Sequence, residues 1–235
     1  MKTPTKIVNA RNLGKLSYAE SWALQEEIFQ QIIQQKRTNR SAENPTATQN
    51  HLLFVEHPPV FTLGKSGDLK HLLVSEEQLK SKGIEFFKTN RGGDITFHGP
   101  GQLVGYPLLD LDHFFTDIHK YLRLLEEAVI LTLADYGIQA SRSAGETGVW
   151  LAVGTPFARK ICAMGIRASR WVTMHGWALN VNTDLNYFDA IIPCGIQGKG
   201  VTSMAKELGQ ELPIDEVQER WIGHFENLFQ ARVEW

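Results

Sequence analysis

The residue with the clearest capacity for chemistry is Cys194, which lies between a proline and a glycine in the segment IIPCGI. A thiol at such a corner is held rigidly and can be exposed, and its thiolate is a strong nucleophile. Because a free thiol with a pKa of about 8.5 is mostly protonated at neutral pH, it needs a nearby base or cation. The sequence offers Lys160, His98 and His175 for that role. This combination predicts covalent catalysis by a cysteine, although a cysteine before a glycine is also simply a small residue.

Cys162 is the alternative nucleophile. It lies in the strand-like run RKICAMGI, two residues after Lys160. On a strand these two side chains would share a face, roughly 7 Å apart. A thiol inside a strand usually packs as a small apolar residue, however, so Cys194 is the preferred nucleophile. The two cysteines form no CxxC motif, and their spacing to the histidines matches no zinc pattern, so we expect no metal.

The segment RGGDITFHGPGQ, residues 91–102, contains four glycines around one histidine. Glycine lets the backbone reach positive φ and lets a ligand approach the main chain closely. The segment therefore indicates a binding loop, a short strand and a second tight turn, with two purely structural turns as the alternative. It does not fit GxGxxG, and residues 64–66 lack the first glycine of a P-loop, which argues against a phosphate site.

Helical and strand-like patterns surround these residues. Helices are predicted from a cap at Ser17, from a capping box at Ser75 to Gly83, from Thr116 or Asp117 to Gly137, and from Pro213 onward. Strand-like runs occupy residues 51–57, 84–88, 102–111, 148–153, 159–168 and 171–182, and a hairpin-length gap at Ser169 and Arg170 separates the last two. We expect an α/β (α+β) fold, a mixed sheet flanked by helices, as a single domain over residues 1–235. The polar segment 36–50 is expected to be a surface-loop insertion.

Composition limits the class of protein. Hydrophobic residues make up 43% and charged residues 21% of the 235 residues, as in an ordinary globular protein. The net charge of −2 gives no basic excess for binding nucleic acid. There is no apolar run of transmembrane length, and the polar start MKTPTKIVNA has no signal-peptide core. The expectation is a cytoplasmic protein that binds neither nucleic acid nor membrane.

Several blocks of sequence, in this order and spacing, resemble the lipoyl(octanoyl) transferases. They are EHPPVFTLGKSG (56–67), RGGDITFHGPGQLVGYPLLDL (91–111), ARKICAMGIR (158–167), HGWALNVNTDL (175–185), IIPCGI (191–196) and GVTSM (200–204). The resemblance runs from about Tyr18 to Leu228. Segment 36–50 looks like an insertion relative to shorter members, and Asp94-Ile95 occupies a position that varies in the family.

The resemblance implies an acyltransferase that moves an octanoyl group from octanoyl-acyl carrier protein to a lysine of a lipoyl domain. The transfer would pass through a cysteine thioester and would be the first step of protein lipoylation. The implied acceptors are lipoyl domains of 2-oxoacid dehydrogenases and the glycine cleavage H protein. The resemblance also implies a fold similar to the catalytic domain of biotin and lipoate ligases, a monomer, and no cofactor.

The resemblance also assigns the site. The acyl-thioester cysteine falls on Cys194, and the lysine that lowers the pKa of its thiol falls on Lys160, which is also the candidate to take the proton of the acceptor lysine. The substrate-contact segments fall on Arg91, Gly92, Gly93, Asp94, Ile95, Thr96, Phe97, His98, Ala163, Met164, Gly165, Gly176, Trp177 and Ala178. His175 is an auxiliary candidate. The sequence leaves open whether His98 relays protons or only positions the substrate.

Three other classes of protein share parts of this pattern. An ATP-dependent lipoate or biotin ligase on the same fold would activate a free acid as an adenylate and would need no cysteine nucleophile. A module that only binds carrier or lipoyl domains would need neither Lys160 nor Cys194. A thioesterase would form the same acyl-enzyme and release the acyl group to water. Consumption of ATP distinguishes the first class, and analysis of the product distinguishes the last.

Overall fold

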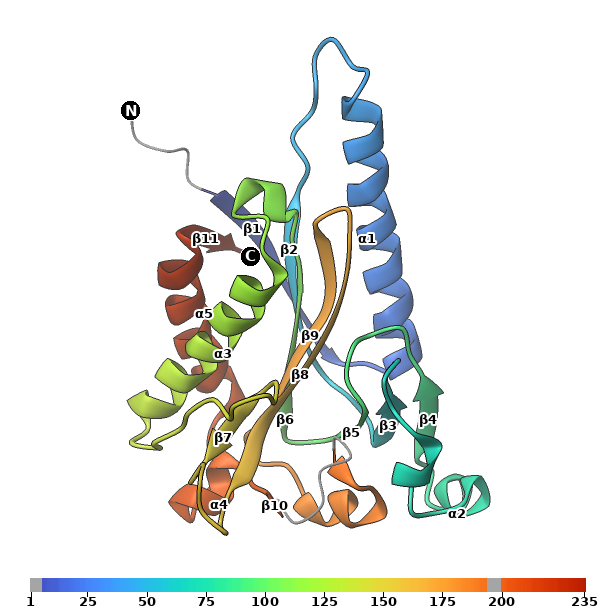
Figure 1. Ribbon diagram of the computed structural model, residues 1–235, viewed down its shortest axis with the longest axis vertical. Helices are drawn as coiled ribbons and strands as arrows, with labels where there is room; N and C mark the ends of the chain where they lie inside the picture. Colours follow the sequence, from blue (N-terminus) through green and yellow to red (C-terminus); the bar gives the residue numbers. More distant parts are fainter. Residues whose placement is uncertain (1–5, 194–199) are drawn as a thin grey trace.

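The computed structural model describes residues 6–193 and 200–235, which form a mixed sheet between helical layers (Figure 1). In spatial order the main sheet contains β10 (Gly200–Val201), β8 (Arg159–Ser169), β9 (Val172–Asn180), β6 (Gln102–Leu108), β2 (Asn50–Glu56), β1 (Lys6–Lys15) and β11 (Ala231–Glu234), and β7 (Val149–Leu151) pairs with β8. A smaller sheet has the order β4 (Glu85–Lys88), β3 (Val60–Leu63) and β5 (Ile95–His98). Both sheets contain parallel and antiparallel pairs, so the predicted mixed sheet is confirmed.

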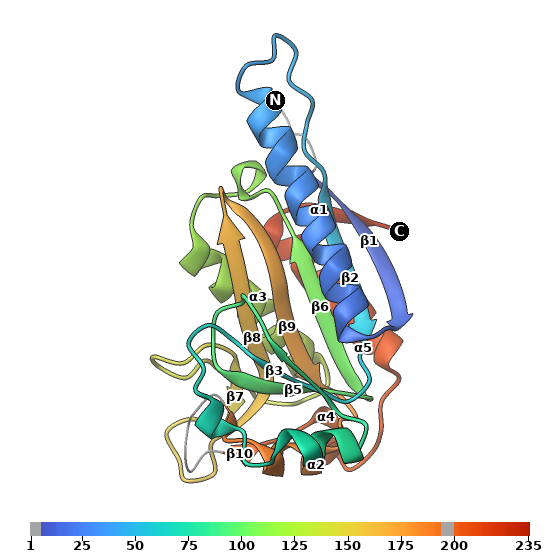
Figure 2. The same cartoon turned by 90° about the vertical axis from the view of Figure 1, so that its right-hand side faces the viewer.

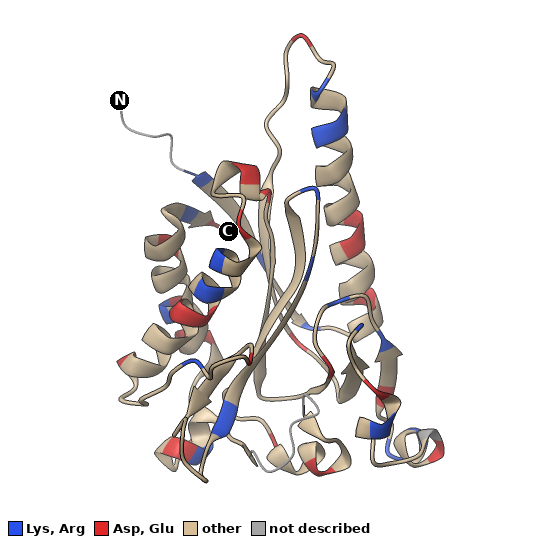
Figure 3. Ribbon diagram, viewed as in Figure 1, with Lys and Arg blue, Asp and Glu red and all other residues tan. Residues whose placement is uncertain are grey.

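Helices cover both faces of the main sheet. They are α1 (Tyr18–Asn39), α2 (Glu76–Ser81), α3 (Ile118–Asp135), α4 (Met204–Leu208) and α5 (Ile214–Phe229), with 3₁₀ turns η1 (Leu69–His71), η2 (Leu111–His113) and η3 (Leu185–Ala190). α3 and α5 lie together on one face, and α1 crosses the other (Figures 1 and 2). Along α1 the acidic residues lie in the first half and the basic residues in the last turns, so the helix carries both signs (Figure 3).

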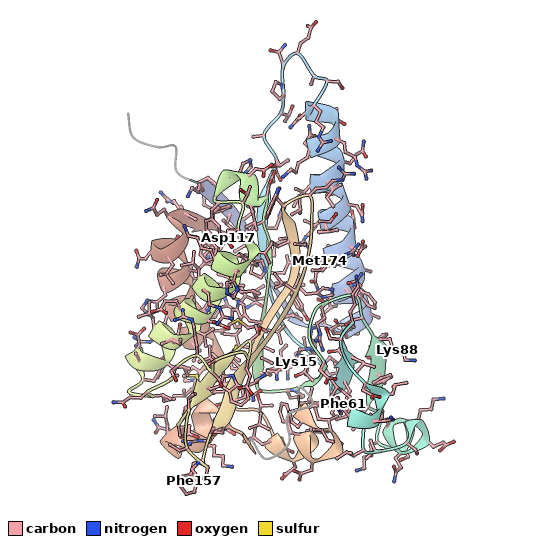
Figure 4. The ribbon with its side chains drawn as sticks, viewed as in Figure 1. Lys15, Phe61, Lys88, Asp117, Phe157 and Met174 are labelled. Carbon is pink, nitrogen blue, oxygen red and sulfur yellow. The ribbon has the colours of Figure 1, made fainter. Side chains whose placement is uncertain are left out.

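Each face of the main sheet has its own hydrophobic cluster. Beneath α3 and α5, the rings of Trp177 and Trp221 lie 4.5 Å apart within the larger cluster. Beneath α1, Phe29 packs on the strands, and Met174 lies between β9 and the helix (Figure 4). Burial of such large apolar side chains is the main force that holds helices against a sheet.

The predicted helix starts are confirmed. The side chains of Ser17, Ser75 and Asp117 each accept a hydrogen bond from a backbone N–H in the first turn of the helix that follows. Ser75 and Gln78 form both reciprocal bonds of a capping box. After α3 the chain turns at Gly137, whose φ of +75° is accessible to glycine without strain.

α1 extends further than its apolar stripe predicts. Lys36 in the last turn pairs with Asp110 and with Asp112, the latter at 2.7 Å. The Asn39 side chain bonds to both the backbone N–H and the carbonyl of Thr46. These polar contacts stabilise the end of the helix, so the irregular part of the predicted 36–50 loop is confined to residues 40–49.

The β8–β9 hairpin forms the long arm of the main sheet. Its turn residues are Arg170 and Trp171, with φ of +53° and +65°, one position later than the predicted gap. Two successive positive φ values match the right-handed twist of the flanking strands. The register pairs Gly165 with Gly176 and Cys162 with Leu179, which brings the two small-residue segments of the sequence side by side.

Several short elements have no clear signal in the sequence. β1 and β11 have mostly polar sequences, because each has a partly exposed face. β3 is buried along all four residues, so it shows no alternation. β10 has only two residues and is defined by its partner β8. Among the described residues, no helix has the length and apolar character required to cross a bilayer.

Candidate active site

A cavity of about 380 Å³ lies between the β8–β9 hairpin and the glycine-rich loop that precedes β5. Its walls are formed by Tyr18, Ser66, Arg91, Gly93, Asp94, Ile95, Thr96, His98, Val104, Tyr106, Gly145, Glu146, Thr147, Lys160, Ala163, Met164, Gly165, His175, Gly176, Trp177 and Ala178. Strands of both sheets therefore contribute to one cavity. Its size is in the range of ordinary small-molecule sites.

Arg91 is folded back into its own loop. Its Nη2 donates to the Thr62 carbonyl at 2.7 Å, to Thr62 Oγ1 at 2.8 Å and to the Asp94 carbonyl at 2.9 Å. Its Nη1 donates to the carbonyl of Gly92 at 3.0 Å. Arg91 as a whole is 7% exposed, so its side chain shapes the loop from inside as well as lining the cavity.

The glycines of this loop permit a close approach to β8. The Gly92 N–H donates to the carbonyl of Ile166 at 2.8 Å. A Cβ added to Gly165 would lie 2.6 Å from the Gly92 carbonyl oxygen, a distance that real Cβ atoms do not adopt. Gly93 has a φ of +86°, which other residues rarely tolerate. The glycines are therefore required both for contact between loop and strand and for the turn within the loop.

Lys160 lies at the cavity wall with 6% of its surface exposed. Its Nζ lies 4.6 Å from the centre of the Trp150 ring. Cys162, two residues later, is completely buried in the cluster beneath α3 and α5. The structure therefore separates the two side chains, which the sequence places on one strand face. The reason is a bulge, because Trp150 pairs with Lys160 and Val149 pairs with Cys162, leaving Ile161 as an extra residue.

The environment of Cys162 opposes thiolate formation. Burial raises the pKa of its thiol far above the ordinary value, and this effect outweighs the backbone hydrogen bond of Ala178 and the charge of Lys160, which lower it. The Sγ atom has a weak contact with the Ala163 carbonyl at 3.6 Å. Cys162 is therefore a packed apolar residue, as the preferred interpretation of the sequence expects.

Cys194 lies outside the described residues. Before it, the Ile192 N–H donates to the carbonyl of His71 at 2.8 Å. After it, β10 runs parallel to β8, with Val201 opposite Lys160. The Thr202 N–H also donates to the Lys160 carbonyl at 2.9 Å. β10 and Thr202 are thus fixed directly beside Lys160.

Three histidines lie in or behind the cavity wall, and all three are buried. Burial lowers the pKa of His175 to about 3 and that of His57 to about 4. Burial, assisted by His57 and Arg91, holds the pKa of His98 well below the usual value. All three imidazoles are therefore neutral at neutral pH. In a neutral imidazole one ring nitrogen donates a hydrogen bond and the other accepts one.

His175 has an unusual backbone. Its φ is +58°, and its N–H donates to Gln25 Oε1 on α1 at 3.0 Å. Its Nε2 donates to Asn90 Oδ1 at 2.7 Å. A positive φ at a residue other than glycine persists only where surrounding contacts enforce it. These bonds join α1, β9 and the start of the glycine-rich loop.

The structure brings most of the predicted site residues together. Those that line the cavity are Lys160, Arg91, Gly93, Asp94, Ile95, Thr96, His98, Ala163, Met164, Gly165, His175, Gly176, Trp177 and Ala178. Gly92 contacts the strand behind the wall. The ring of Phe97 lies away from the cavity, 4.5 Å from that of Tyr187, because alternation along β5 directs it into the core of the small sheet.

Seven lining residues have no prediction from sequence: Tyr18, Ser66, Val104, Tyr106, Gly145, Glu146 and Thr147. Tyr18 begins α1, and its ring stacks on His98 with centroids 5.9 Å apart. The Tyr106 hydroxyl lies 2.8 Å from His57 Nε2. The available signal was the clustering of Tyr and His near helix and strand ends, which on its own also fits an ordinary core.

Comparison with known proteins shows which family and which folds this chain is similar to. Residues 17–226 match the family described as the lipoyl protein ligase A/B catalytic domain. An octanoyltransferase of Christiangramia forsetii is 65% identical over 231 residues, covering 98% of this chain and 99% of that protein. A bipartite lipoate protein ligase from Thermoplasma acidophilum has a TM-score of 0.68 at 19% identity, covering 98% of this chain and 85% of that one. A biotin protein ligase from Aquifex aeolicus has a TM-score of 0.53 at 14% identity, covering 94% and 70%. The predicted likeness to the fold of biotin and lipoate ligases is confirmed.

Proposed function

This chain belongs to the lipoyl protein ligase A/B catalytic domain family, and we propose that it transfers octanoyl from octanoyl-acyl carrier protein to a lysine of a lipoyl domain. The chain is an acyltransferase, since a relative named octanoyltransferase matches nearly its whole length at high identity. The proposal adds the thioester donor, the cysteine intermediate and the lysine acceptor. The recipients would be lipoyl domains of 2-oxoacid dehydrogenases and the glycine cleavage H protein. A single domain, a monomer and a cytoplasmic location remain predictions from sequence.

The observation that carries the proposal is a cavity whose wall contains Lys160 together with small residues of β8 and β9. Ala163, Gly165, Gly176 and Ala178 face it from the two strands of the hairpin. Small side chains leave room for a straight acyl chain. A cationic side chain in the wall of such a cavity is suited to a reacting carbonyl and a thiolate.

In the first half of the proposed reaction, the Cys194 thiolate attacks the carbonyl carbon of the carrier thioester. The tetrahedral intermediate collapses, the pantetheine thiolate leaves and takes a proton from the Lys160 ammonium, and octanoyl stays on Cys194, with Lys160 now neutral. Lys160 would stabilise the thiolate electrostatically before the attack. The buried setting supports this role, because charges interact more strongly where water is excluded.

In the second half, the amine of the acceptor lysine attacks the new thioester. The amine must lose a proton as the amide bond forms, and Lys160 is the proposed recipient. The Cys194 thiolate then leaves and is ready for another cycle. The three buried histidines are neutral, so His98 would position groups by hydrogen bonding rather than by holding a charge.

Intact mass spectrometry tests the proposal. The protein is mixed with octanoyl-acyl carrier protein in the absence of ATP, and we expect a mass gain of one octanoyl group. The gain should be absent in Cys194→Ser, and an added lipoyl domain should discharge it by becoming octanoylated. If the lipoyl domain is modified only with free octanoate and ATP, the protein is a ligase. If octanoate is released without modification of the domain, it is a thioesterase.

A further inference from the structure

A directed chain of buried hydrogen bonds passes behind the cavity. It begins at Arg91, whose Nη2 donates to Thr62 Oγ1 at 2.8 Å. Because that oxygen accepts from the guanidinium, its own proton can turn toward His98 Nε2, which lies 3.5 Å away. This first link connects the glycine-rich loop, β3 and β5.

The second link fixes the tautomer of His98. Its Nδ1 lies 2.8 Å from Gln102 Oε1. The Gln102 amide nitrogen donates to the Phe97 carbonyl at 3.1 Å and to Asn180 Oδ1 at 2.9 Å, so the amide oxygen must be the group that faces the imidazole. An amide oxygen only accepts. His98 therefore carries its proton on Nδ1 and keeps its lone pair on Nε2.

The third link reaches the strand beside Lys160. Asn180 Nδ2 donates to the carbonyl of Thr202 at 2.9 Å. The Thr202 N–H donates in turn to the Lys160 carbonyl at 2.9 Å. The chain thus runs in one direction from Arg91 to Thr202, the residue after β10, and every donor has a matching acceptor at each link.

The side chains that link this hydrogen-bond chain, Thr62, His98, Gln102 and Asn180, are all buried. A second cavity, of only about 10 Å³, is lined by Gln102, Asn180 and Lys160 among others, which brings the two amides close to the lysine side chain. Hydrogen bonds at low dielectric are strong, and a reversed or missing partner is costly there.

We propose that Gln102 and Asn180 are positioning residues for acyl transfer, which hold His98 in its neutral Nδ1–H tautomer and fix β10 beside Lys160. The role in transfer rests on the proposed function, whereas the tautomer does not. An amide is required at residue 102, because it must accept from His98 and donate to Asn180 at the same time. A carboxylate could accept but could not donate.

The charged and titratable groups around the chain determine how an added charge would act. They are Arg91 and Asp94 from the loop before β5, Glu146 from the loop before β7, His57 after β2, Tyr18 on α1, Tyr106 on β6, Lys160 on β8 and His175 on β9. Gln102→Glu would add a buried carboxylate to this set. It would stabilise the imidazolium of His98 and the ammonium of Lys160.

Nitrogen NMR of the full-length protein, labelled at its histidines, tests the tautomer directly. We expect the ring of His98, assigned by comparison with His98→Gln, to be neutral with the proton on Nδ1 from pH 6 to pH 8. In Gln102→Glu the same ring should bind a second proton in that range. A wild-type ring with its proton on Nε2 would overturn the inference, whatever reaction the protein catalyses.

Kinetics of octanoyl transfer test the positioning role. Gln102→Glu should lower kcat about tenfold at pH 7 with little change in KM for the donor. The apparent pKa read from the pH profile of kcat should rise by about one unit. Gln102→Met, which adds no charge, should lower kcat without moving that ionisation. Gln218→Glu is the matched control, since Gln218 is an equally buried amide on α5. An unshifted profile in Gln102→Glu, with wild type active and the variant folded, would overturn the role.

Discussion

Lys160 and Trp150 form a buried cation–ring pair across β8 and β7, with Nζ 4.6 Å from the centre of the indole ring. Both residues are almost fully buried. The face of an indole ring attracts a cation, and the attraction grows where water is excluded. Trp150 therefore helps to hold the Lys160 side chain at the cavity wall.

Trp150→Leu should reduce octanoyl transfer about tenfold, because a desolvated cation–ring contact contributes about 1–2 kcal/mol. Trp150→Phe should retain part of the activity, since the smaller ring keeps a weaker face. The measurement is kcat, with the unfolding midpoint of each variant recorded. Trp221→Leu, which removes an equally buried indole from α5, is the control. An equal loss of kcat in the control would mean that only general packing is involved.

The serine variants of the two cysteines should differ in whether they form the octanoyl adduct. Cys162→Ser should still form the octanoyl adduct, because Cys162 is packed in the core and its raised pKa disfavours the thiolate. The variant should lose about 1–3 kcal/mol of stability, since a hydroxyl replaces a buried thiol. Cys194→Ser should form no adduct. The opposite result, an adduct in Cys194→Ser and none in Cys162→Ser, would make Cys162 the nucleophile.

Gly165→Ala should strongly impair donor binding. The added methyl would lie 2.6 Å from the Gly92 carbonyl and 3.3 Å from the Arg91 side chain, so the glycine-rich loop must move away from β8. We expect KM for octanoyl-acyl carrier protein to rise at least tenfold. Gly223→Ala is the matched control, because nothing lies within 4 Å of its added methyl on α5. That change should add up to about 1 kcal/mol of stability, as alanine favours helix, and leave KM unchanged.

The stability of the fold should fall in mild acid. Burial lowers the pKa of His57 from 6.5 to about 4, against a smaller opposing effect of its bond to Leu16. Between pH 6.5 and pH 4 the unfolded chain therefore binds a proton at His57 that the folded chain does not bind. The contribution of His57 to the free energy of unfolding is full above pH 6.5 and declines toward pH 4. The loss from this one group amounts to roughly 3 kcal/mol.

His57→Gln should flatten this dependence, because glutamine can keep a donor toward Leu16 and an acceptor toward Tyr106 without titrating. The measurement is the urea midpoint at intervals from pH 4.5 to pH 7.5. His119→Gln, at an exposed position on α3, should retain the slope of the wild type. A wild-type slope in His57→Gln would show that other groups cause the acid instability.

The sequence predicts elements that depend on local chemistry. The caps at Ser17, Ser75 and Asp117 bind backbone N–H groups of the first helical turn. Such a cap depends only on a few residues that are neighbours in the sequence. The likeness of six ordered blocks to one family also predicted most of the residues that line the cavity.

What the sequence does not predict depends on partners far along the chain. The bulge at Ile161 exists because β7 supplies one residue opposite two, and it separates Lys160 from Cys162. Arg91 turns into its own loop because Thr62, on another strand, offers two acceptors. The hydrophobic periodicity of a single segment cannot predict contacts with segments far along the chain.

The pairing of β1 with β11 affects how the protein is made. β1 is parallel to β2 on one side and to β11 on the other, with Lys6 opposite Ala231. While the ribosome is still synthesising the intervening helices, β1 has an uncovered edge that can pair with other chains. The nascent chain covers this edge only when β11 emerges. Translation rate and chaperone supply should therefore influence the yield of active protein.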